Sequence, residues 1–518
     1  MKNHPKGLIG AALSNMGERF GFYIMMAILT LFISSKFGLS DTTTLVIYSI
    51  FYASIYVLAL LGGVIADRTR KYKTTIMWGL ILMMIGYVLI AIPTQTPVAN
   101  LGLMLAVTCF GLLVIAVGNG FFKGNLQAVV GQLYDNPKYS NKRDTGFQIF
   151  YMFINIGGAL APLVGIAVRN WWLQKNNFLY DSTLSKLCHQ FLNGTIEPAA
   201  GERFTALANE VSTAGPVTDL TAFANDYLNV FTTGFHYAFI AAAIMMIVSM
   251  VIFIANKNKL PDPAKKEVKK AEGGAASPAQ VQMDIKEIKQ RIYALFAVFG
   301  VVIFFWFSFH QNGATLTFFA RDYVDLSMIK FNINLGFTNI PIQGAEIFQS
   351  VNPTLVVLLT FPIIGLFAWL RKKNMEPSTP RKIAIGMGIA ALAYVLLMIC
   401  SQGLPDAAAR EAMGGLTDAM RVSPWVLVGT YFILTVAELF ISPLGLSFVS
   451  KVAPPHLQGL MQGCWLAATA VGNLLVMLGG FFYESLPLWG TWLVFVCACA
   501  ISMGAMLGMV KWLERVAK

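Results

Sequence analysis

Residues 7–33 read GLIGAALSNMGERFGFYIMMAILTLFI, an apolar run that carries two charges, Glu18 and Arg19, near its middle. A helix of about 20 mainly apolar residues is long enough to cross the hydrocarbon core of a bilayer. The two charges are incompatible with the apolar region of a cleavable signal peptide. We therefore expect a first membrane-spanning helix over 8–35.

Eleven further apolar runs meet the same length rule. The whole chain of 518 residues is 56% hydrophobic and only 12% charged, against roughly 25% charged in soluble domains. This composition excludes a soluble multidomain protein, and it excludes a disordered chain, which needs low hydrophobicity. The twelve predicted spans cover 8–35, 44–66, 74–93, 99–130, 146–168, 234–255, 292–320, 350–370, 382–401, 423–450, 458–483 and 488–510.

The basic residues set the predicted orientation. The net charge is +12, but Lys and Arg lie in short tracts between apolar runs, so we expect no nucleic-acid partner. With the amino terminus inside, 27 of the 38 basic residues fall in inside segments and 9 in outside segments. Because Lys and Arg are retained in the cytoplasm, both termini are predicted to be cytoplasmic, in the cytoplasmic (inner or plasma) membrane.

Two long polar segments divide the chain. Residues 169–233 are predicted to form an extracytoplasmic insert with some amphipathic helix, and 256–290 a basic cytoplasmic linker. The linker would separate an amino-terminal six-helix bundle, 1–255, from a carboxy-terminal one, 291–518. Six plus six spans are typical of two-bundle transporters with a midplane substrate site. We therefore predict an all-α integral membrane protein with two bundles around a central cavity.

Five ionisable residues interrupt the apolar spans, where a charge is costly and indicates function. Two cations, two acids and a histidine from both halves can line a hydrated cavity and bind a zwitterion. The alternative is that Glu18 and Arg19 merely hold helices together. The set comprises Glu18, Arg19, Lys123, His310 and Glu438.

A loop motif at the cytoplasmic end of the second span matches the signature of the major facilitator superfamily. Gly62 and Gly63 would permit close helix approach, and Asp67 could cap or pair with a neighbouring helix end. Arg68 and Lys71 complete the motif. We expect Gly63, Asp67 and Arg68 to serve gating.

Five ordered motifs extend this likeness. The chain resembles the proton-dependent oligopeptide transporters of that superfamily through nearly all of its spans. The motifs are Asn15-Met-Gly-Glu18-Arg19-Phe20-Gly-Phe22-Tyr23, Gly118-Asn-Gly120-Phe-Phe-Lys123-Gly-Asn125, Phe147-Gln-Ile-Phe150-Tyr151-Met-Phe-Ile-Asn155-Ile-Gly157, Asn352-Pro353, and Glu438-Leu-Phe-Ile-Ser442-Pro443-Leu-Gly445 followed by Trp465.

The resemblance implies a role for each matching residue. Arg19 and Lys123 would receive the peptide carboxylate with help from Tyr23, since an Arg fork and a Lys point charge both suit carboxylates. A carboxylate and two amides would satisfy the three donors of the peptide ammonium. Those amine-binding residues are Glu438, Asn155 and Asn352, and the aromatic walls are Tyr56, Trp306 and Trp465.

The sequence departs from the family where proton coupling is expected. Asn15 replaces the first acid of the first-span motif, Phe22 its first Tyr, and Met26 a common arginine. His310 stands where members commonly carry Glu, and its ordinary pKa near 6.5 suits proton carriage. The open alternatives are Glu18, Glu438, or a weakly coupled transporter in which His310 only packs.

The resulting prediction is proton-coupled symport of di- and tripeptides into the cytoplasm by alternating access. One alternative is a weakly coupled transporter of small organic anions or drugs, and a second is a non-transporting peptide receptor. We expect the lipid bilayer, protons and peptide as partners, a monomer, and neither cofactor nor metal. No grouping of nucleophile, base and metal ligands indicates an enzyme.

Overall fold

The computed structural model describes residues 4–69, 71–139, 143–261, 285–334, 336, 338–454 and 458–516. Twelve of its helical stretches are long and apolar enough to cross a membrane, and each overlaps one predicted span. They are carried by α1 (Gly7–Phe37), α2 (Asp41–Thr69), α3 (Tyr72–Ala91), α4 (Leu101–Leu133), α5 (Arg143–Lys175), α8 (Leu220–Asn256), α10 (Ile285–Phe309), α12 (Val351–Lys372), α13 (Thr379–Cys400), α15 (Pro424–Val452), α16 (Gln458–Leu475) and α18 (Leu488–Val516).

Two of the spans are broken helices. The seventh continues from α10 through η3 (His310–Gly313) into α11 (Thr315–Tyr323), and the eleventh continues from α16 into α17 (Met477–Ser485). Gly313 allows the close approach of α2 at the first break, because a Cβ there would lie 2.4 Å from the Tyr48 hydroxyl. Broken helices at membrane depth are typical of transporter sites.

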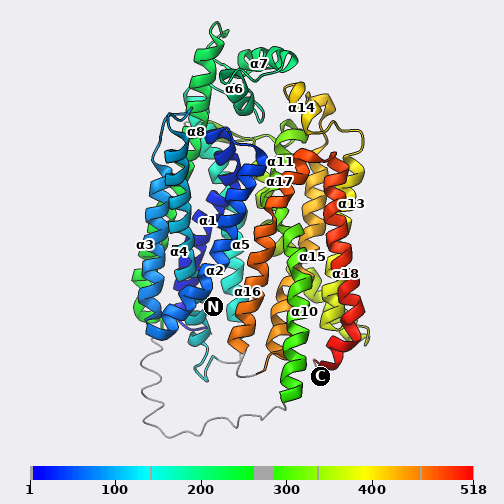
Figure 1. The fold of residues 1–518 in the computed structure, drawn as a ribbon. Helices are drawn as coiled ribbons and strands as arrows, with labels where there is room; N and C mark the ends of the chain where they lie inside the picture. The colour runs from blue at the N-terminus through cyan, green and yellow to red at the C-terminus, as the bar shows by residue number, and fades with distance from the viewer. Residues whose placement is uncertain are drawn as a thin grey trace.

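The helices form two groups that follow the chain order (Figure 1). In the first half α3 packs on α4, and α1 packs on α5 and α8; in the second half α13 packs on α15 and α18. Across the halves, α2 contacts α16 and α17, and α5 contacts α12. The predicted linker 256–290 falls mostly on 262–284, outside the described residues, so the boundary between the halves stays a prediction.

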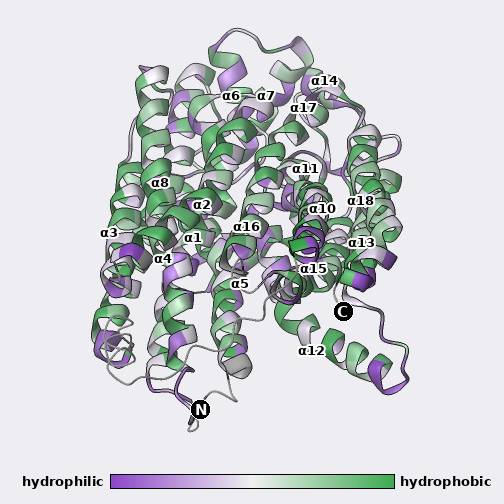
Figure 2. Cartoon of the chain, turned by 60° about the horizontal axis from the view of Figure 1, so that its bottom comes forward, coloured by the Kyte–Doolittle hydropathy of each residue, from purple (hydrophilic) through white to green (hydrophobic). Residues whose placement is uncertain are grey.

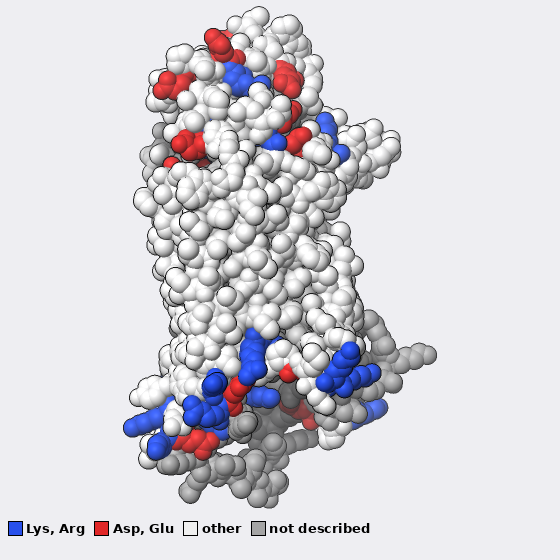
Figure 3. Space-filling model, turned by 90° about the vertical axis from the view of Figure 1, so that its right-hand side faces the viewer, with Lys and Arg blue, Asp and Glu red and all other residues white. Residues whose placement is uncertain are grey.

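The outer surface of the helices is apolar. Figure 2 shows hydrophobic residues along most helices, and Figure 3 shows a broad band without Lys, Arg, Asp or Glu between two charged ends. Phe361 on α12 is 74% exposed, which water would disfavour and lipid would not. The band has the pattern of a surface that faces a bilayer.

Glycines set the tight packing in the first half. A Cβ on Gly79 of α3 would lie 2.7 Å from the carbonyl oxygen of Gly118 on α4, and one on Gly118 would lie 2.6 Å from the Gly79 carbonyl. The two backbones therefore touch directly, as small residues allow in membrane helices.

A helical cap covers one end of the molecule, which we call the insert end; both termini lie at the opposite, terminal end (Figure 1). The cap contains α6 (Leu184–Leu192) and α7 (Pro198–Val211) from the first half and α14 (Ala407–Ala412) from the second. The amphipathic helix predicted within 169–233 is thus present. The insert itself is shorter than predicted, because α5 runs on to Lys175 and α8 already begins at Leu220.

A small hairpin is an exception to the all-helical prediction. Strands β1 (Phe331–Asn334) and β2 (Asn339–Ile342) pair antiparallel, with Phe331 opposite Ile342. Ile340 and Ile342 pack against Ile166 of α5, so the hairpin of the second half covers a helix of the first. Short 3₁₀ turns complete the chain: η2 (Lys257–Lys259), η4 (Leu326–Ile329), η5 (Ala345–Ser350) and η6 (Asp418–Met420).

Candidate substrate-binding site

Glu18 and Arg19 are neighbours on α1 and form a buried ion pair. Arg19 donates from Nε to Glu18 Oε2 at 2.5 Å and from Nη2 to Oε1 at 2.6 Å. Asn119 of α4 donates a third hydrogen bond to Glu18 Oε1 at 3.0 Å. Glu18 therefore occupies two N–H donors of Arg19 and also links α1 to α4. The pair thus helps to hold two helices together, as the structural alternative expects.

Lys123 lies one turn after Asn119 on α4 and is partly exposed. Its ammonium stands 4.8 Å from the ring centroid of Tyr56 on α2, which is a cation–π distance. It also lies within electrostatic range of Arg19 and Glu18. Among the described residues no carboxylate lies within ion-pair distance of Lys123, so this cation is not neutralised.

Glu438 on α15 is the corresponding acidic group of the second half. Asn352 of α12 donates through Nδ2 to Glu438 Oε2 at 2.9 Å and to Thr435 Oγ1 at 3.0 Å. Glu438 is partly exposed, and no cationic side chain in the described part of the chain lies within ion-pair distance of it. Within the described part of the chain, the site thus holds one acid and one cation that lack ion-pair partners, both in apolar spans.

Three tyrosines connect these two charged groups. Tyr23 and Tyr56 each lie within electrostatic range of both Arg19 and Glu438. Tyr151 of α5 is 52% exposed and interacts with Glu438 and with the other two tyrosines. Arg19, Lys123 and Glu438 therefore lie around one group of tyrosines, and their roles in binding stay predictions. Tyr151 was not among the predicted site residues, although it stands inside the fifth-span motif.

The other predicted aromatic walls are more buried than Tyr56. Trp306 stacks on His310 with ring centroids 4.9 Å apart, and Tyr52 meets the same imidazole edge-on at 4.9 Å. Trp465 packs on α15 at Gly445, where a Cβ would lie 2.0 Å from its ring. Both tryptophans are buried, and their role as walls of the site stays a prediction.

Asn155 is buried, and its amide donates to the Tyr151 carbonyl of its own helix at 3.1 Å. Its side-chain oxygen is the acceptor that could reach a ligand. Of the three predicted proton carriers, Glu18 and His310 are buried and Glu438 is partly exposed. Among the described residues no cluster of His, Cys, Asp and Glu could hold a metal ion.

The two glycines of the loop motif differ in their surroundings. A Cβ on Gly62 would lie 2.2 Å from the Gly120 carbonyl of α4, whereas one on Gly63 would meet nothing within 4 Å. The expectation of close approach is therefore right for Gly62 and wrong for Gly63, and the gating role of Gly63 stays a prediction. Arg68 is exposed, and the side chain of Asp67 lies outside the described residues.

Buried ion pairs that were not predicted join the halves at the insert end. Arg169 of α5 pairs with Glu346 of η5, and both side chains are fully buried. Arg321 of α11 binds Asp41 of α2 through two hydrogen bonds of 3.0 and 2.7 Å. These partners are distant in sequence, so no local pattern signals them.

The family model described as the POT family matches residues 73–271 and 256–480. The chain belongs to the POT family. These are the proton-dependent oligopeptide transporters, so the chain is a multi-pass membrane transporter and not an enzyme.

Among its relatives, the chain is 29% identical to the peptide transporter YePEPT of Yersinia enterocolitica, over 92% of this chain and 88% of that protein. It is 26% identical to dipeptide and tripeptide permease B of Shigella dysenteriae, over 100% and 97%. A crystal structure of the peptide transporter POT with sulfate superposes with a TM-score of 0.70 at 22% identity, covering 99% of this chain and 96% of that one. At this identity the structure shows the shared major facilitator fold.

Proposed function

We propose that this chain carries di- and tripeptides into the cytoplasm together with protons, by alternating access. The observation that carries the proposal is that Lys123 on one half and Glu438 on the other have no ion-pair partner among the described residues. Charges at membrane depth are kept where they bind a substrate or an ion. A peptide zwitterion supplies an anion for Lys123 and a cation for Glu438, and by binding both it links the two halves.

The carboxylate end offers two cations. Glu18 holds the Nε–Nη2 edge of Arg19, and the Nη1–Nη2 edge keeps N–H donors for a peptide carboxylate beside Lys123. A proton on Glu18 would weaken its hold on Arg19 and release the second edge as well. Tyr23 is a further donor.

The amine end is arranged to accept hydrogen bonds. Asn352 spends its NH₂ group on Glu438 and Thr435, which leaves its carbonyl oxygen free to accept. Glu438 keeps a second carboxylate oxygen for the ammonium. Asn155, whose NH₂ group is used within its own helix, supplies a second amide oxygen. Tyr56, Trp306 and Trp465 are proposed as tolerant apolar walls.

Three groups are proposed for proton transfer: Glu18, His310 and Glu438. Glu438 is partly exposed and can exchange protons with water in this conformation. His310 lies in an aromatic box with Trp306 and Tyr52 beside Asn473, within electrostatic range of Lys123. A His310→Gln protein that keeps the parental dependence on pH would exclude His310 as the carrier.

The relatives and the charge pattern support this assignment. Two of the similar proteins are named as a peptide transporter and as a dipeptide and tripeptide permease. We propose the bacterial-type cytoplasmic membrane with the terminal end inside, because Lys and Arg gather there (Figure 3). Gly63, Asp67 and Arg68 would act at that end in gating. We propose a monomer, although one structure of similar fold is of a tetramer.

The test is uptake of labelled dialanine into proteoliposomes, with and without an inward acid gradient. We expect saturable uptake that the gradient accelerates. The matched variants are Lys123→Gln and Glu438→Gln, each offered dialanine, N-acetyl-dialanine and dialanine amide. Lys123→Gln should lose preference for the free carboxylate, and Glu438→Gln for the free amine. Absence of saturable uptake in both conditions would refute the function.

A further inference from the structure

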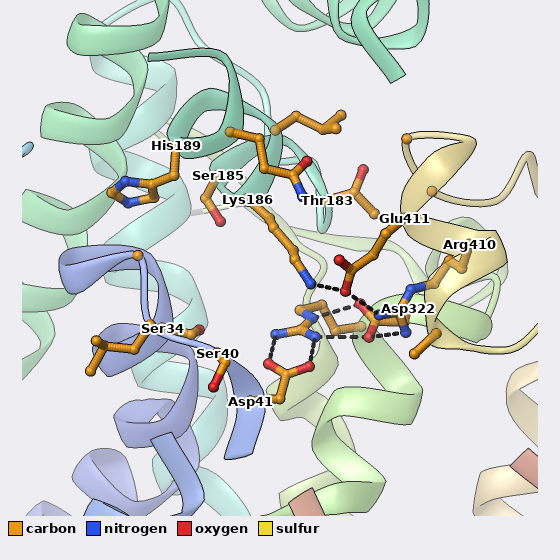
Figure 4. Close-up of a pocket in the computed structure, with 18 of the residues that line it drawn as sticks. Ser34, Ser40, Asp41, Thr183, Ser185, Lys186, His189, Asp322, Arg410 and Glu411 are labelled. Atoms are coloured by element: carbon orange, nitrogen blue, oxygen red, sulfur yellow. Dashed lines mark hydrogen bonds and ion pairs between the residues drawn. The ribbon is translucent and has the colours of Figure 1, made fainter. Parts of the chain in front are cut away.

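A polar pocket lies at the insert end, apart from the central site. It has a volume of about 480 Å³ and lies between α6 of the insert and α14 of the second half (Figure 4). Its wall is rich in hydroxyl and amide groups, which include Ser34, Ser40, Ser185, Gln190, Asn193 and Thr195. Drug-sized ligands occupy pockets of roughly 300–1,000 Å³, so the space suits a small molecule.

The floor of this pocket is made of charges that are fully paired. Arg321 binds Asp41 on one side and binds Asp322 through hydrogen bonds of 2.7 and 2.8 Å on the other. Arg410 of α14 adds a bond of 2.6 Å to Asp322, and the Tyr483 hydroxyl adds one of 3.0 Å. All four charged side chains are buried. A ligand would therefore gain little free energy by binding to these four side chains, because each charge already has an oppositely charged partner.

The rim carries a different kind of ion pair. Lys186 of α6 pairs with Glu411 of α14, and their side chains are 41% and 38% exposed. Exposed pairs of this kind contribute roughly 0–1 kcal/mol, since water competes for both partners. Arg410 stands 3.4 Å from the same Glu411 oxygen, a long contact. The rim pair is therefore the one that an incoming ligand can exchange.

We propose that this pocket is an outer docking site for zwitterionic short peptides. The proposal rests on the proposed function for the substrate class and for the insert end being external. The peptide carboxylate would pair with Lys186 and its ammonium with Glu411, so that the ligand replaces the direct ion pair. An anion alone would take Lys186 and leave Glu411 only its 3.4 Å contact with Arg410, and a cation alone would take Glu411 away from Lys186. The rim thus selects molecules that carry both charges.

The size and position of the pocket agree with this use. An extended dipeptide spans at most about 7 Å, at roughly 3.3–3.6 Å for each residue, so the long side chains of Lys186 and Glu411, now in direct contact, must separate to hold one end each. The floor pair Asp41–Arg321 joins helix α2 of the first half to α11 of the second. A peptide held at the rim would therefore stand directly above the seam through which it must pass to reach Lys123 and Glu438.

The test is hydrogen–deuterium exchange of the purified full-length Glu438→Gln protein, in which the central site has lost its amine-binding acid. Dialanine at ten times its Kd for this pocket should slow amide hydrogen exchange in α6 and α14 by up to roughly tenfold. The single-charge analogues N-acetyl-dialanine and dialanine amide should protect these segments much less.

Two further variants localise the effect. Lys186→Gln combined with Glu411→Gln removes both rim charges while keeping two amides that can bond to each other, and should abolish the protection. Gln190→Trp fills the pocket while leaving the rim charges in place, and should also abolish it. Equal protection by all three ligands, or protection that survives both variants, would overturn the proposal.

The experiment separates this inference from the proposed function. Dialanine uptake by the unmodified protein without protection of α6 and α14 would overturn the docking site and leave transport standing. Protection of α6 and α14 without uptake would refute transport and leave the docking site standing.

Discussion

Replacement of Glu346 by Gln tests whether the buried ion pairs hold the insert end closed. Arg169 and Glu346 come from different halves, and neither side chain is exposed. Arg169 also donates to the Gln343 carbonyl and to Asn170 Oδ1, each at 3.0 Å, and its guanidinium lies 4.2 Å from the Tyr180 ring. Glu346→Gln removes the only negative charge among these contacts and keeps the side-chain shape.

The expected magnitude follows from burial. Removing one partner of a buried ion pair costs roughly 3–5 kcal/mol, because the remaining charge is left in a low dielectric. Arg169 keeps its other contacts, so we expect the lower value, about 3 kcal/mol. A conformation that opens the insert end hydrates Arg169 and avoids this cost. The population of that conformation should therefore rise by roughly 100-fold, since 1.4 kcal/mol is a factor of ten.

The assay is labelling of a Tyr56→Cys reporter by an impermeant maleimide added at the insert end, in a background whose six cysteines are replaced by Ala. Glu411→Gln is the matched control, because the Lys186–Glu411 pair also joins the halves but is exposed. Glu346→Gln should accelerate labelling far more than Glu411→Gln, whose pair contributes at most about 1 kcal/mol. Equal rates in the two variants would show that burial of the pair does not decide closure.

Three further predictions follow from the geometry. Gly62→Ala should lower the thermal midpoint of unfolding, and the adjacent Gly63→Ala should not. A Cβ at Gly62 would lie 2.2 Å from the Gly120 carbonyl oxygen, whereas one at Gly63 would meet nothing within 4 Å. Overpacking typically costs about 1–3 kcal/mol. Burial lowers the pKa of His189, whose Nε2 lies 2.7 Å from the Ser35 carbonyl oxygen. Helix α6 should therefore lose stability as pH falls below the unfolded pKa near 6.5. Hydrogen exchange of α6 at pH 5 and 7.5 should show this loss, and His189→Gln should remove it. Lys123→Gln should raise KM for dialanine by roughly 10- to 100-fold, as expected for a lost charge-assisted bond of about 1.5–3 kcal/mol. It should hardly change KM for dialanine amide, which has no free carboxylate. A similar rise for both peptides would contradict the role of Lys123.

The sequence predicts the spans well because the signal is local. A run of apolar residues must be helical in a bilayer, and its length fixes its ends to within a few residues. The sixth span departs most: α8 begins at Leu220, well before the predicted 234, because Asp219 caps the helix by accepting from the amides of Thr221 and Ala222. Polar helix outside the membrane carries no hydropathy signal, so residues 220–233 are predicted as part of the insert and not of the span.

The central site is partly predictable for the same reason. Charges inside apolar runs are visible one by one, and Lys123 and Glu438 stand out without any structure. The sequence does not show that these two residues lack ion-pair partners among the described residues, since this depends on which helices pack together. The two hydrogen bonds between Glu18 and Arg19 could not be predicted from their adjacency in the sequence, because neighbouring residues on a helix need not face each other.

The features that the sequence did not reveal depend on distant contacts. Asp41, Arg321 and Arg410 lie in three separate segments and look like ordinary loop-end charges in sequence. The hairpin had a weak signal in the alternation of Phe331, Asn332, Ile333 and Asn334. That signal was too short to compete with the stronger helical pattern on either side.

The cap at the insert end touches both halves, since Gly414, next to α14, packs on Ala200 and Arg203 of α7. Any movement of one half against the other must therefore pull on a water-exposed contact well clear of the lipid. An antibody fragment that grips α7 and α14 together would clamp the molecule from outside. Such a reagent would arrest the cycle without entering the membrane and would provide a rigid marker for imaging a small particle.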